Sequence, residues 1–456
     1  MKIELDSFIK AFSALPDGVV SAELDAERRE EQSVMVSNGA ASGGEYFDVF
    51  GLYLRATAES TGYVYTENLS SDPYALILEA VENTQGLSAV SKEPLNCDPR
   101  PLRIYAEDDG CGYEEMLDLG KKLEQEARKH PDVASADVSL CKTTFSRRVI
   151  NSQKLDRYAE NIYYEVMLII ELKRADGSNT QGYHTVCVPA LKDVSGDALI
   201  PAAIANAQRL DAGGTLPPIA VRTGKYRAVL SASAVTNILM TAWRMFSSDN
   251  ILSGVSPLHG IPGEVVGNKH LNIISAPSCP GWGCRFPMDA EGTLTDTRYI
   301  VKGGILQSPL HNLRSARNAK TSATGHAGRG VTLSGVSPIN MEILPNIFYI
   351  EPSQVSEEAL LAKLQDGIYI TNSFDEFHSV NFADGTFSIP CQGILYRNSQ
   401  SVGYDDQITI AGSLSELFSN LEGVADNLLL RAFNYKNYCY GGPSLLVREL
   451  IVGGKG

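Results

Sequence analysis

The chain has 456 residues, of which 43% are hydrophobic and 20% charged, and this is the composition of a globular protein with material for two substantial domains. Its formal net charge is −15 and it has no stripe of Lys and Arg, which excludes the basic face that nucleic-acid binding needs. No apolar stretch approaches the ~20 residues of a membrane helix. Acidic residues stand in the first six positions, where a signal peptide would be apolar, so a cytoplasmic protein without membrane contact is expected.

Residues 1–215 are predicted to form an N-terminal mixed α/β domain. Asp72 precedes Pro73 in the pattern of a helix N-cap followed by proline in the first turn. Alternating residues predict strands, and apolar residues at helical spacing predict helices. In chain order the expected elements are strands at 46–56 and 63–66, helices from Asp72-Pro73 and at 114–129, strands at 162–172 and 182–189, and a helix at 197–210.

Residues 220–456 are predicted to form a C-terminal β-rich, barrel-like domain. The segment 211–218 is dense in Gly and Pro and is the expected linker. After it come a strand at 221–230, a long central helix at 232–248 and many short β-prone runs, interrupted by short helices at 356–364 and 414–422. Strands gathered in one half of the chain predict the α+β class.

Common catalytic signatures are absent from the sequence. It holds no GxSxG elbow, no phosphate-binding GxxxxGK[ST] loop and no complete GxGxxG. None of the seven histidines is followed by Glu, and no two lie within one helical turn, so an HExxH-type zinc helix is excluded. The eight cysteines form no CxxC pair and are expected to be reduced thiols. A metal site assembled from distant loops stays open.

Five segments of the second half resemble, in order, motifs of the TldD/TldE (PmbA) family, which is also labelled modulator of DNA gyrase. Together they span about 220 to 452, and the third is typical of the TldE side of the family. They are Leu258–Val266, Phe286–Gly292, Ser322–Gly328, Asn381–Ser388 with Gly393, and Thr409–Gly412.

The resemblance implies a two-domain subunit that pairs with a second family member around a cavity and acts on unfolded or extended peptides. The TldD partner would carry zinc on a helix with two histidines and a glutamate, and a cysteine near its C-terminus would be a third ligand. No cofactor is expected in this chain. The residues implied to line a peptide channel are Asn381, Gly385, Phe387 and Cys439. Around Asp384 the alternation predicts an exposed strand edge that could pair with substrate.

The central helix separates this chain from the zinc-bearing half. Residues 231–246 contain neither His nor Glu, and Val235, Leu239, Ala242 and Phe246 form one apolar stripe, so a core or interface helix is predicted. A single thiolate at Cys439 is a poor zinc site, and a packing role is favoured.

The acidic turn allows two interpretations. Asp289 and Glu291 could form a carboxylate pair for acid–base chemistry. A solvated structural turn stabilised by Gly292 is the favoured interpretation.

The main hypothesis is a TldE-like subunit without a zinc site, in a cytosolic metallopeptidase with a TldD-like partner. The first alternative is a self-sufficient peptidase with an atypical site around Cys439 and loop histidines. The second is a homodimeric peptide-binding protein without catalysis.

Overall fold

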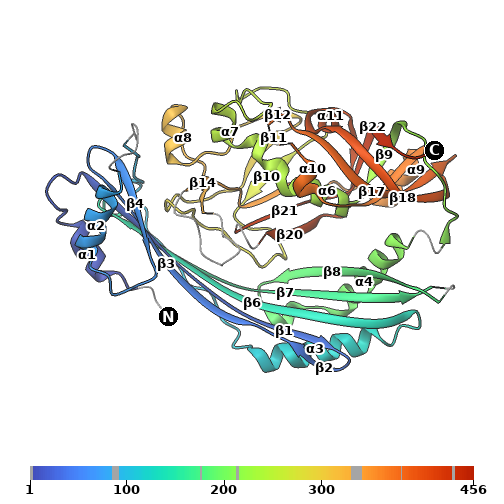
Figure 1. The fold of residues 1–456 in the computed structure, drawn as a ribbon, viewed down its shortest axis with the longest axis horizontal. Helices are drawn as coiled ribbons and strands as arrows, with labels where there is room; N and C mark the ends of the chain where they lie inside the picture. The colour runs from blue at the N-terminus through green and yellow to red at the C-terminus, as the bar shows by residue number, and fades with distance from the viewer. Residues whose placement is uncertain are drawn as a thin grey trace.

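The structure is a computed structural model that describes residues 4–84, 92–174, 177–211, 215–329, 341–381, 383–433 and 437–456. Within these residues the chain forms one long antiparallel-rich sheet, a barrel and a second, smaller sheet (Figure 1). No helix in the described part is long and apolar enough to cross a membrane.

The N-terminal sheet has eight described strands in the order β4-β3-β1-β6-β7, with β2 beside β1 and both β5 and β8 beside β7. It is long because β1, β6 and β7 each run for 17 to 19 residues. The strands are β1 (Ser21–Ser37), β2 (Ala40–Gly43), β3 (Tyr46–Thr57), β4 (Thr61–Thr66), β5 (Leu102–Ile104), β6 (Val133–Asn151), β7 (Asp156–Lys173) and β8 (Asn179–Val188).

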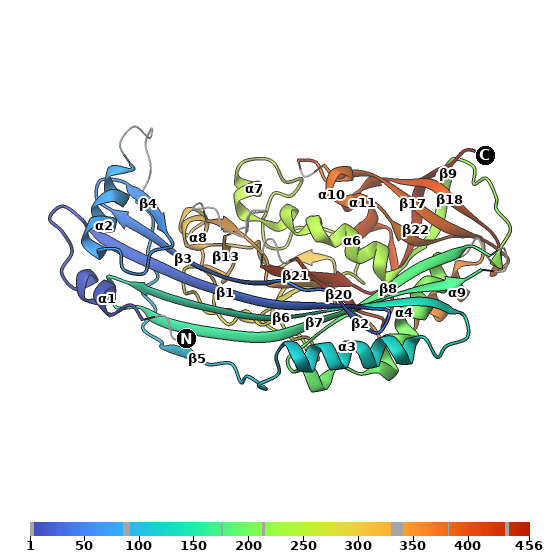
Figure 2. The same ribbon diagram turned by 60° about the horizontal axis from the view of Figure 1, so that its bottom comes forward.

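Four helices cover one face of this sheet, with α1 (Asp6–Phe12) and α2 (Pro73–Glu82) at one end and α3 (Tyr113–Ala127) and α4 (Gly196–Leu210) at the other (Figure 2). The predicted cap of α2 is confirmed, since the Asp72 carboxylate accepts a hydrogen bond from the Tyr74 N–H at 3.2 Å. The predicted helices at 114–129 and 197–210 are confirmed as α3 and α4.

Strand β1 shows how the two faces of the sheet differ. Side chains alternate between faces along a strand, and Leu24 and Ala26 pack into the core beneath α1 and α2. Glu23, Asp25 and Glu27 therefore lie on the opposite face, and all three are nevertheless buried. The second domain reaches this face, since Arg329 lies 3.3 Å from Asp25.

The barrel closes through five strands in the order β18-β17-β16-β9-β22, because β18 also pairs with β22. Strand β19 extends β22 at the side. These strands are β9 (Gly224–Leu230), β16 (Gly367–Ser373), β17 (Thr386–Arg397), β18 (Gln400–Ser413), β19 (Leu421–Val424) and β22 (Leu445–Gly453). The short helices nearby are α9 (Glu357–Leu364), α10 (Glu376–Ser379) and α11 (Leu414–Ser419). The predicted α+β class with a barrel-like second half is confirmed.

A second sheet of six described strands has the order β12-β11-β10-β15-β21-β20, and a separate pair is formed by β13 and β14. The strands are β10 (Ile273–Ala276), β11 (Arg298–Lys302), β12 (Ile305–Leu306), β13 (Ala327–Gly328), β14 (Glu342–Ile343), β15 (Ile347–Ile350), β20 (Leu429–Phe433) and β21 (Tyr438–Gly442). Helix α8 (Leu313–Asn318) follows β12. The boundaries 1–215 and 220–456 stay predictions.

The central helix α6 (Ala232–Ala242) packs against β16, β20 and β21 and belongs to the largest core. It is shorter than the predicted 232–248, because it tightens into a 3-10 turn, Trp243–Phe246, and resumes as α7 (Ser248–Leu252). The break has a tertiary cause. Ser248 donates its N–H to the Leu310 carbonyl at 3.1 Å, and Leu310 donates to the Phe246 carbonyl at 2.8 Å, so these groups are not available to a continuous helix.

Candidate functional site

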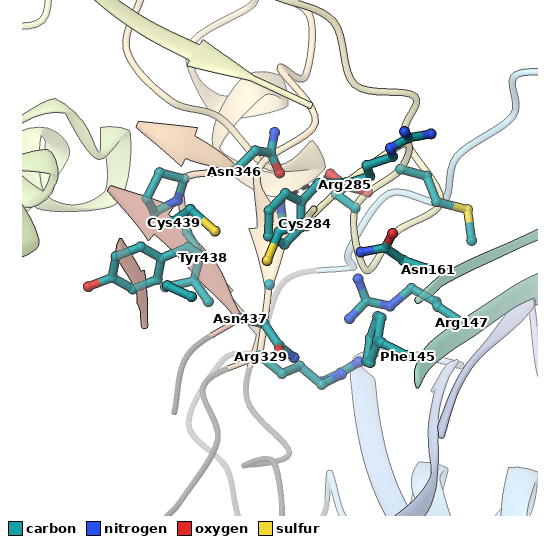
Figure 3. A pocket seen from close by; sticks show the side chains of 18 of the residues that line it. Phe145, Arg147, Asn161, Cys284, Arg285, Arg329, Asn346, Asn437, Tyr438 and Cys439 are labelled. Carbon is teal, nitrogen blue, oxygen red and sulfur yellow. Dashed lines mark hydrogen bonds between the residues drawn. The ribbon is translucent and has the colours of Figure 1, made fainter. Parts of the chain in front are cut away.

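A small cavity of about 50 Å³ lies between β6 and β7 of the first sheet and the loops of the second domain. Three arginines, Arg147, Arg285 and Arg329, line it together with several amide side chains. Figure 3 shows Cys439 on the left of the view, Cys284 near the middle and Arg147 on the right. The cavity therefore joins cations from both domains with two thiols.

Arg147 and Arg329 reach the buried acids of β1. The Arg147 side chain pairs with Glu27 and lies 3.2 Å from Asp25, and Arg329 lies 3.3 Å from Asp25. The Arg329 guanidinium also stacks 4.5 Å above the ring of Tyr53. Burial raises the pKa of Asp25 to about 7, although Arg147 opposes that shift. The two domains therefore meet through paired charges that are shielded from water.

A second buried cluster surrounds Arg55 on β3. Its guanidinium lies 2.7 Å from Glu23, 3.0 Å from Glu93 and 3.3 Å from Glu291. Glu291 also accepts a hydrogen bond at 2.8 Å from the Leu313 N–H, at the start of α8. Arg55 therefore fastens the acidic turn of the second domain to the first sheet.

The turn at 289–292 is present, but it is buried and not solvated as predicted, since Asp289 is 3% and Glu291 1% exposed. Gly292 has φ of +66°, and a Cβ there would approach Leu155 to 2.8 Å, so glycine suits both the backbone and the packing. Its carbonyl accepts a hydrogen bond from Arg157. The correction has a physical cause, because the first domain covers the turn.

The acidic turn and the Thr-Gly-His-Ala-Gly segment meet at Asp289. Its carboxylate accepts hydrogen bonds from the N–H groups of Glu291 at 2.9 Å, Thr293 at 2.8 Å and Ala327 at 3.0 Å. Burial raises the pKa of Asp289 to about 6, and it raises that of Glu291 to about 8. These carboxyl groups thus hold loops together, and an acid–base role for them stays a prediction.

His326 is a packed histidine beside the cavity. Its ring shares hydrogen bonds with the hydroxyls of Ser275 at 2.8 Å and Thr324 at 2.7 Å. Burial lowers the pKa of His326 to about 3, so the ring is neutral at physiological pH. It positions the segment that supplies Ala327 and Arg329.

Cys439 lies in the cavity wall, as part of a buried cluster of thiols and aromatic rings. Its sulfur accepts a hydrogen bond from Trp282 Nε1 at 3.3 Å. The neighbouring Cys284 sulfur lies 3.5 Å from that of Cys187, and burial raises the pKa of Cys284 well above its ordinary value. No histidine is among the described residues that line the cavity, so no Cys–His pair is formed there.

The other three predicted channel residues lie elsewhere, at the start of β17. Phe387 is buried in the barrel core, and Gly385 adopts φ of +70° in the preceding turn. The prediction of an exposed strand edge around Asp384 is wrong. Strand β18 pairs with one side of β17, and on the other side the Asn381 N–H binds the Thr386 carbonyl and the Phe374 N–H binds the Pro390 carbonyl, both at 2.8 Å. A role for these residues in a channel stays a prediction.

Three arginines that organise the site were not predicted from the sequence, namely Arg55, Arg147 and Arg329. A signal was present in β1, where acids at 23, 25 and 27 alternate with Leu24 and Ala26. Such alternation is typical of a strand with two different faces. Among the described residues, no three His, Cys, Asp or Glu side chains are grouped so that they could hold a metal ion.

Comparison with known proteins identifies the family of this chain. The family model for the PmbA/TldA metallopeptidase C-terminal domain matches residues 223–454. A protein of Archaeoglobus fulgidus named as a metalloprotease is 27% identical over 206 residues, which are 45% of this chain and 46% of that protein. The matched region thus spans about half the length of this curated relative.

Two solved structures share the fold over nearly the whole chain. A candidate modulator of a DNA gyrase from Thermotoga maritima superposes with a TM-score of 0.81 at 22% identity, over 98% of this chain and 100% of that one. TldE from Thermococcus kodakarensis superposes with a TM-score of 0.77 at 17% identity, over 95% and 97%. With half of its residues matched by the family model, the chain belongs to the PmbA/TldD family.

Proposed function

We propose that this chain is the subunit without a zinc site in a cytosolic TldD/TldE-type metallopeptidase. Its zinc-bearing partner supplies the activated water, and this chain forms part of the wall around an extended or unfolded peptide. Family membership supports the peptidase assignment. The composition of α6 supports the assignment of zinc to the partner and not to this chain.

The proposal rests on the side chains of the central helix α6, which include no zinc ligand. Zinc hydrolysis needs three protein ligands and an open position for water, and residues 231–246 supply neither His nor Glu. Two polar side chains in the middle of α6 are already engaged in the fold. Thr236 donates to the Leu429 carbonyl at 3.1 Å and Asn237 to the Ser373 carbonyl at 3.2 Å, while Val235 and Leu239 are buried in the core.

The cavity between the domains is consistent with a wall and not with a reaction centre. Two of its arginines, Arg147 and Arg329, are held by buried acids, and the carboxyl of Asp289 accepts hydrogen bonds from three N–H donors. Hydrolysis of an amide at neutral pH needs an activated water or nucleophile, and the described lining residues form no such pair.

The proposal is tested by co-expressing this chain with a TldD-like partner and assaying an unfolded peptide with each chain alone and with the complex. We expect cleavage by the complex, its loss with chelator, and about one zinc per complex carried by the partner. The matched control is a complex whose partner has lost one zinc-binding histidine. Chelator-resistant cleavage by this chain alone would favour the self-sufficient peptidase, and peptide binding without assembly with the partner would favour the homodimeric binding protein.

A further inference from the structure

A larger cavity, of about 240 Å³, lies at a different junction of the two domains. It is bounded by α4, by strand β8 at the edge of the first sheet, by the first turn of α6 and by β20. Strands β8 and β20 lie beside each other in both views (Figures 1 and 2). Pockets that enclose a whole small-molecule ligand usually measure about 300–1,000 Å³. This cavity is smaller, and its size fits the terminal part of a peptide chain.

The lining of this cavity is cationic in a chain whose net charge is −15. Its cations are Arg209 and Arg431, His184 lies in the same lining, and no Asp or Glu is among its described residues. Burial, and then the charges of Arg431 and Arg209, lower the pKa of His184. Glu358 lies within electrostatic reach of Arg209 but does not line the cavity. The local charge therefore favours an anion.

The two arginines differ in how they are held. Arg431 bonds to Asn237, to the Tyr183 hydroxyl at 2.9 Å and to Ser233 Oγ at 3.3 Å, so its guanidinium is fixed across the domain junction. Arg209 is half-buried and makes no hydrogen bond or ion pair with any described residue. An arginine presents five N–H donors, and three of those of Arg431 are engaged. Donors of both residues are thus left for a carboxylate.

The edge of β8 offers backbone groups beside these cations. Strand β8 pairs with β7 on one side. On the other side, the Tyr183 N–H donates to Asn206 Oδ1 at 3.0 Å and the Cys187 carbonyl accepts from the Gly283 N–H at 2.9 Å. In an antiparallel strand, alternate residues point their N–H and C=O groups to the same side. Thr185 lies midway between Tyr183 and Cys187, so its N–H and C=O groups also point away from β7, into the cavity wall.

We propose that this cavity binds the C-terminal carboxylate of an extended peptide, with Arg209 and Arg431 as the carboxylate ligands and Thr185 pairing with the last peptide unit. Arginine suits a carboxylate because its planar donors match both oxygens. A strand edge recognises an extended backbone without regard to sequence. The inference rests on the proposed function for the identity of the ligand as a peptide.

The test is fluorescence anisotropy of the full-length chain alone with a labelled, unstructured peptide, either with a free C-terminus or amidated. A hydrogen bond to a charged group contributes about 1.5–3 kcal/mol, so we expect the free acid to bind at least about tenfold more tightly. Arg209→Gln and Arg431→Gln should each remove that preference. Arg222→Gln, an exposed arginine outside the cavity, is the matched control and should keep it.

Several outcomes would overturn the inference: no binding of the free acid, equal binding of the two peptides, or a preference that survives Arg209→Gln in a protein with unchanged melting. Displacement of the peptide by inorganic phosphate as readily as by an unlabelled free-acid peptide would reduce the site to a general oxyanion site and refute the peptide assignment. The measurement needs neither zinc nor cleavage. The two proposals can therefore fail independently. The preference for a free carboxylate can be observed even if the complex does not cleave peptides, and it can be absent even if the complex cleaves them.

Discussion

Replacing Arg55 with methionine tests whether the buried charge network holds the two domains together. The Arg55 side chain is 4% exposed, and its guanidinium contacts Glu23, Glu93 and Glu291, of which the last belongs to the acidic turn of the second domain. Methionine keeps an unbranched apolar stem and removes the charge. Glu23 and Glu291, whose side chains are each 2% exposed, then lose the cation that their carboxyl groups contact.

The expected loss in free energy of unfolding is about 3–5 kcal/mol, because removing one partner of a buried ion pair leaves uncompensated charge in the interior. Carboxyl groups that lose the arginine can take up protons, so the loss should be largest above about pH 8. The matched control is Arg28→Met. Arg28 lies 2.7 Å from Asp48, whose side chain is 35% exposed, and pairs of this kind contribute about 0–1 kcal/mol.

Urea unfolding of the full-length chain, followed by tryptophan fluorescence and circular dichroism, compares the two variants. Adding Glu291→Gln to Arg55→Met should recover part of the loss, because one of the stranded carboxyl groups is then neutral. If Arg55→Met falls within about 1 kcal/mol of Arg28→Met above pH 8, the charges do not stabilise the domain junction and the argument is refuted.

Three further predictions concern the acidic turn, the central core and Cys439. A carboxyl whose pKa is higher folded than unfolded stabilises the fold fully below its unfolded pKa of about 4.3 and loses that contribution as pH rises through the folded value. Burial raises the pKa of Glu291 to about 8, so stability should fall from about pH 5 to pH 8, and Glu291→Gln should flatten that slope in thermal melts. Trp243→Ala, in the largest core, should cost about 3–5 kcal/mol in urea unfolding. An unchanged midpoint would contradict this. Cys439→Ser should leave zinc in the complex unchanged by elemental analysis.

The helices were predictable because their signals are local. Asp72 and Pro73 mark the start of α2, and the apolar spacing of α3 and α4 locates both helices within a few residues. The end of α6 was not predictable in this way. Its continuation is interrupted by hydrogen bonds to Leu310, which lies more than sixty residues away in the chain. No property of residues 243–248 themselves predicts these hydrogen bonds.

The long strands β1 and β6 were missed because their charges resemble those of a solvated segment. In β1, residues 27–31 are Glu-Arg-Arg-Glu-Glu, and β6 carries Arg147 and Arg148. A charged residue is rarely buried unless it is paired, and pairing cannot be read before the strands are aligned. The antiparallel register of β1 and β6 places Glu27 opposite Arg147, and only this alignment shows that Glu27 is paired and buried at the domain junction.

The candidate site shows the same dependence on long-range pairing. The acidic turn and the Thr-Gly-His-Ala-Gly segment could each be singled out from the sequence, yet the hydrogen bond from Ala327 to Asp289 that unites them spans 38 residues. The ion pair from Arg55 to Glu291 spans 236. Because burial raises the pKa of Asp25, Asp289 and Glu291 together, any motion that separates the domains and admits water would let these carboxyl groups ionise. Separation and proton release are therefore coupled, and higher pH should favour the separated state.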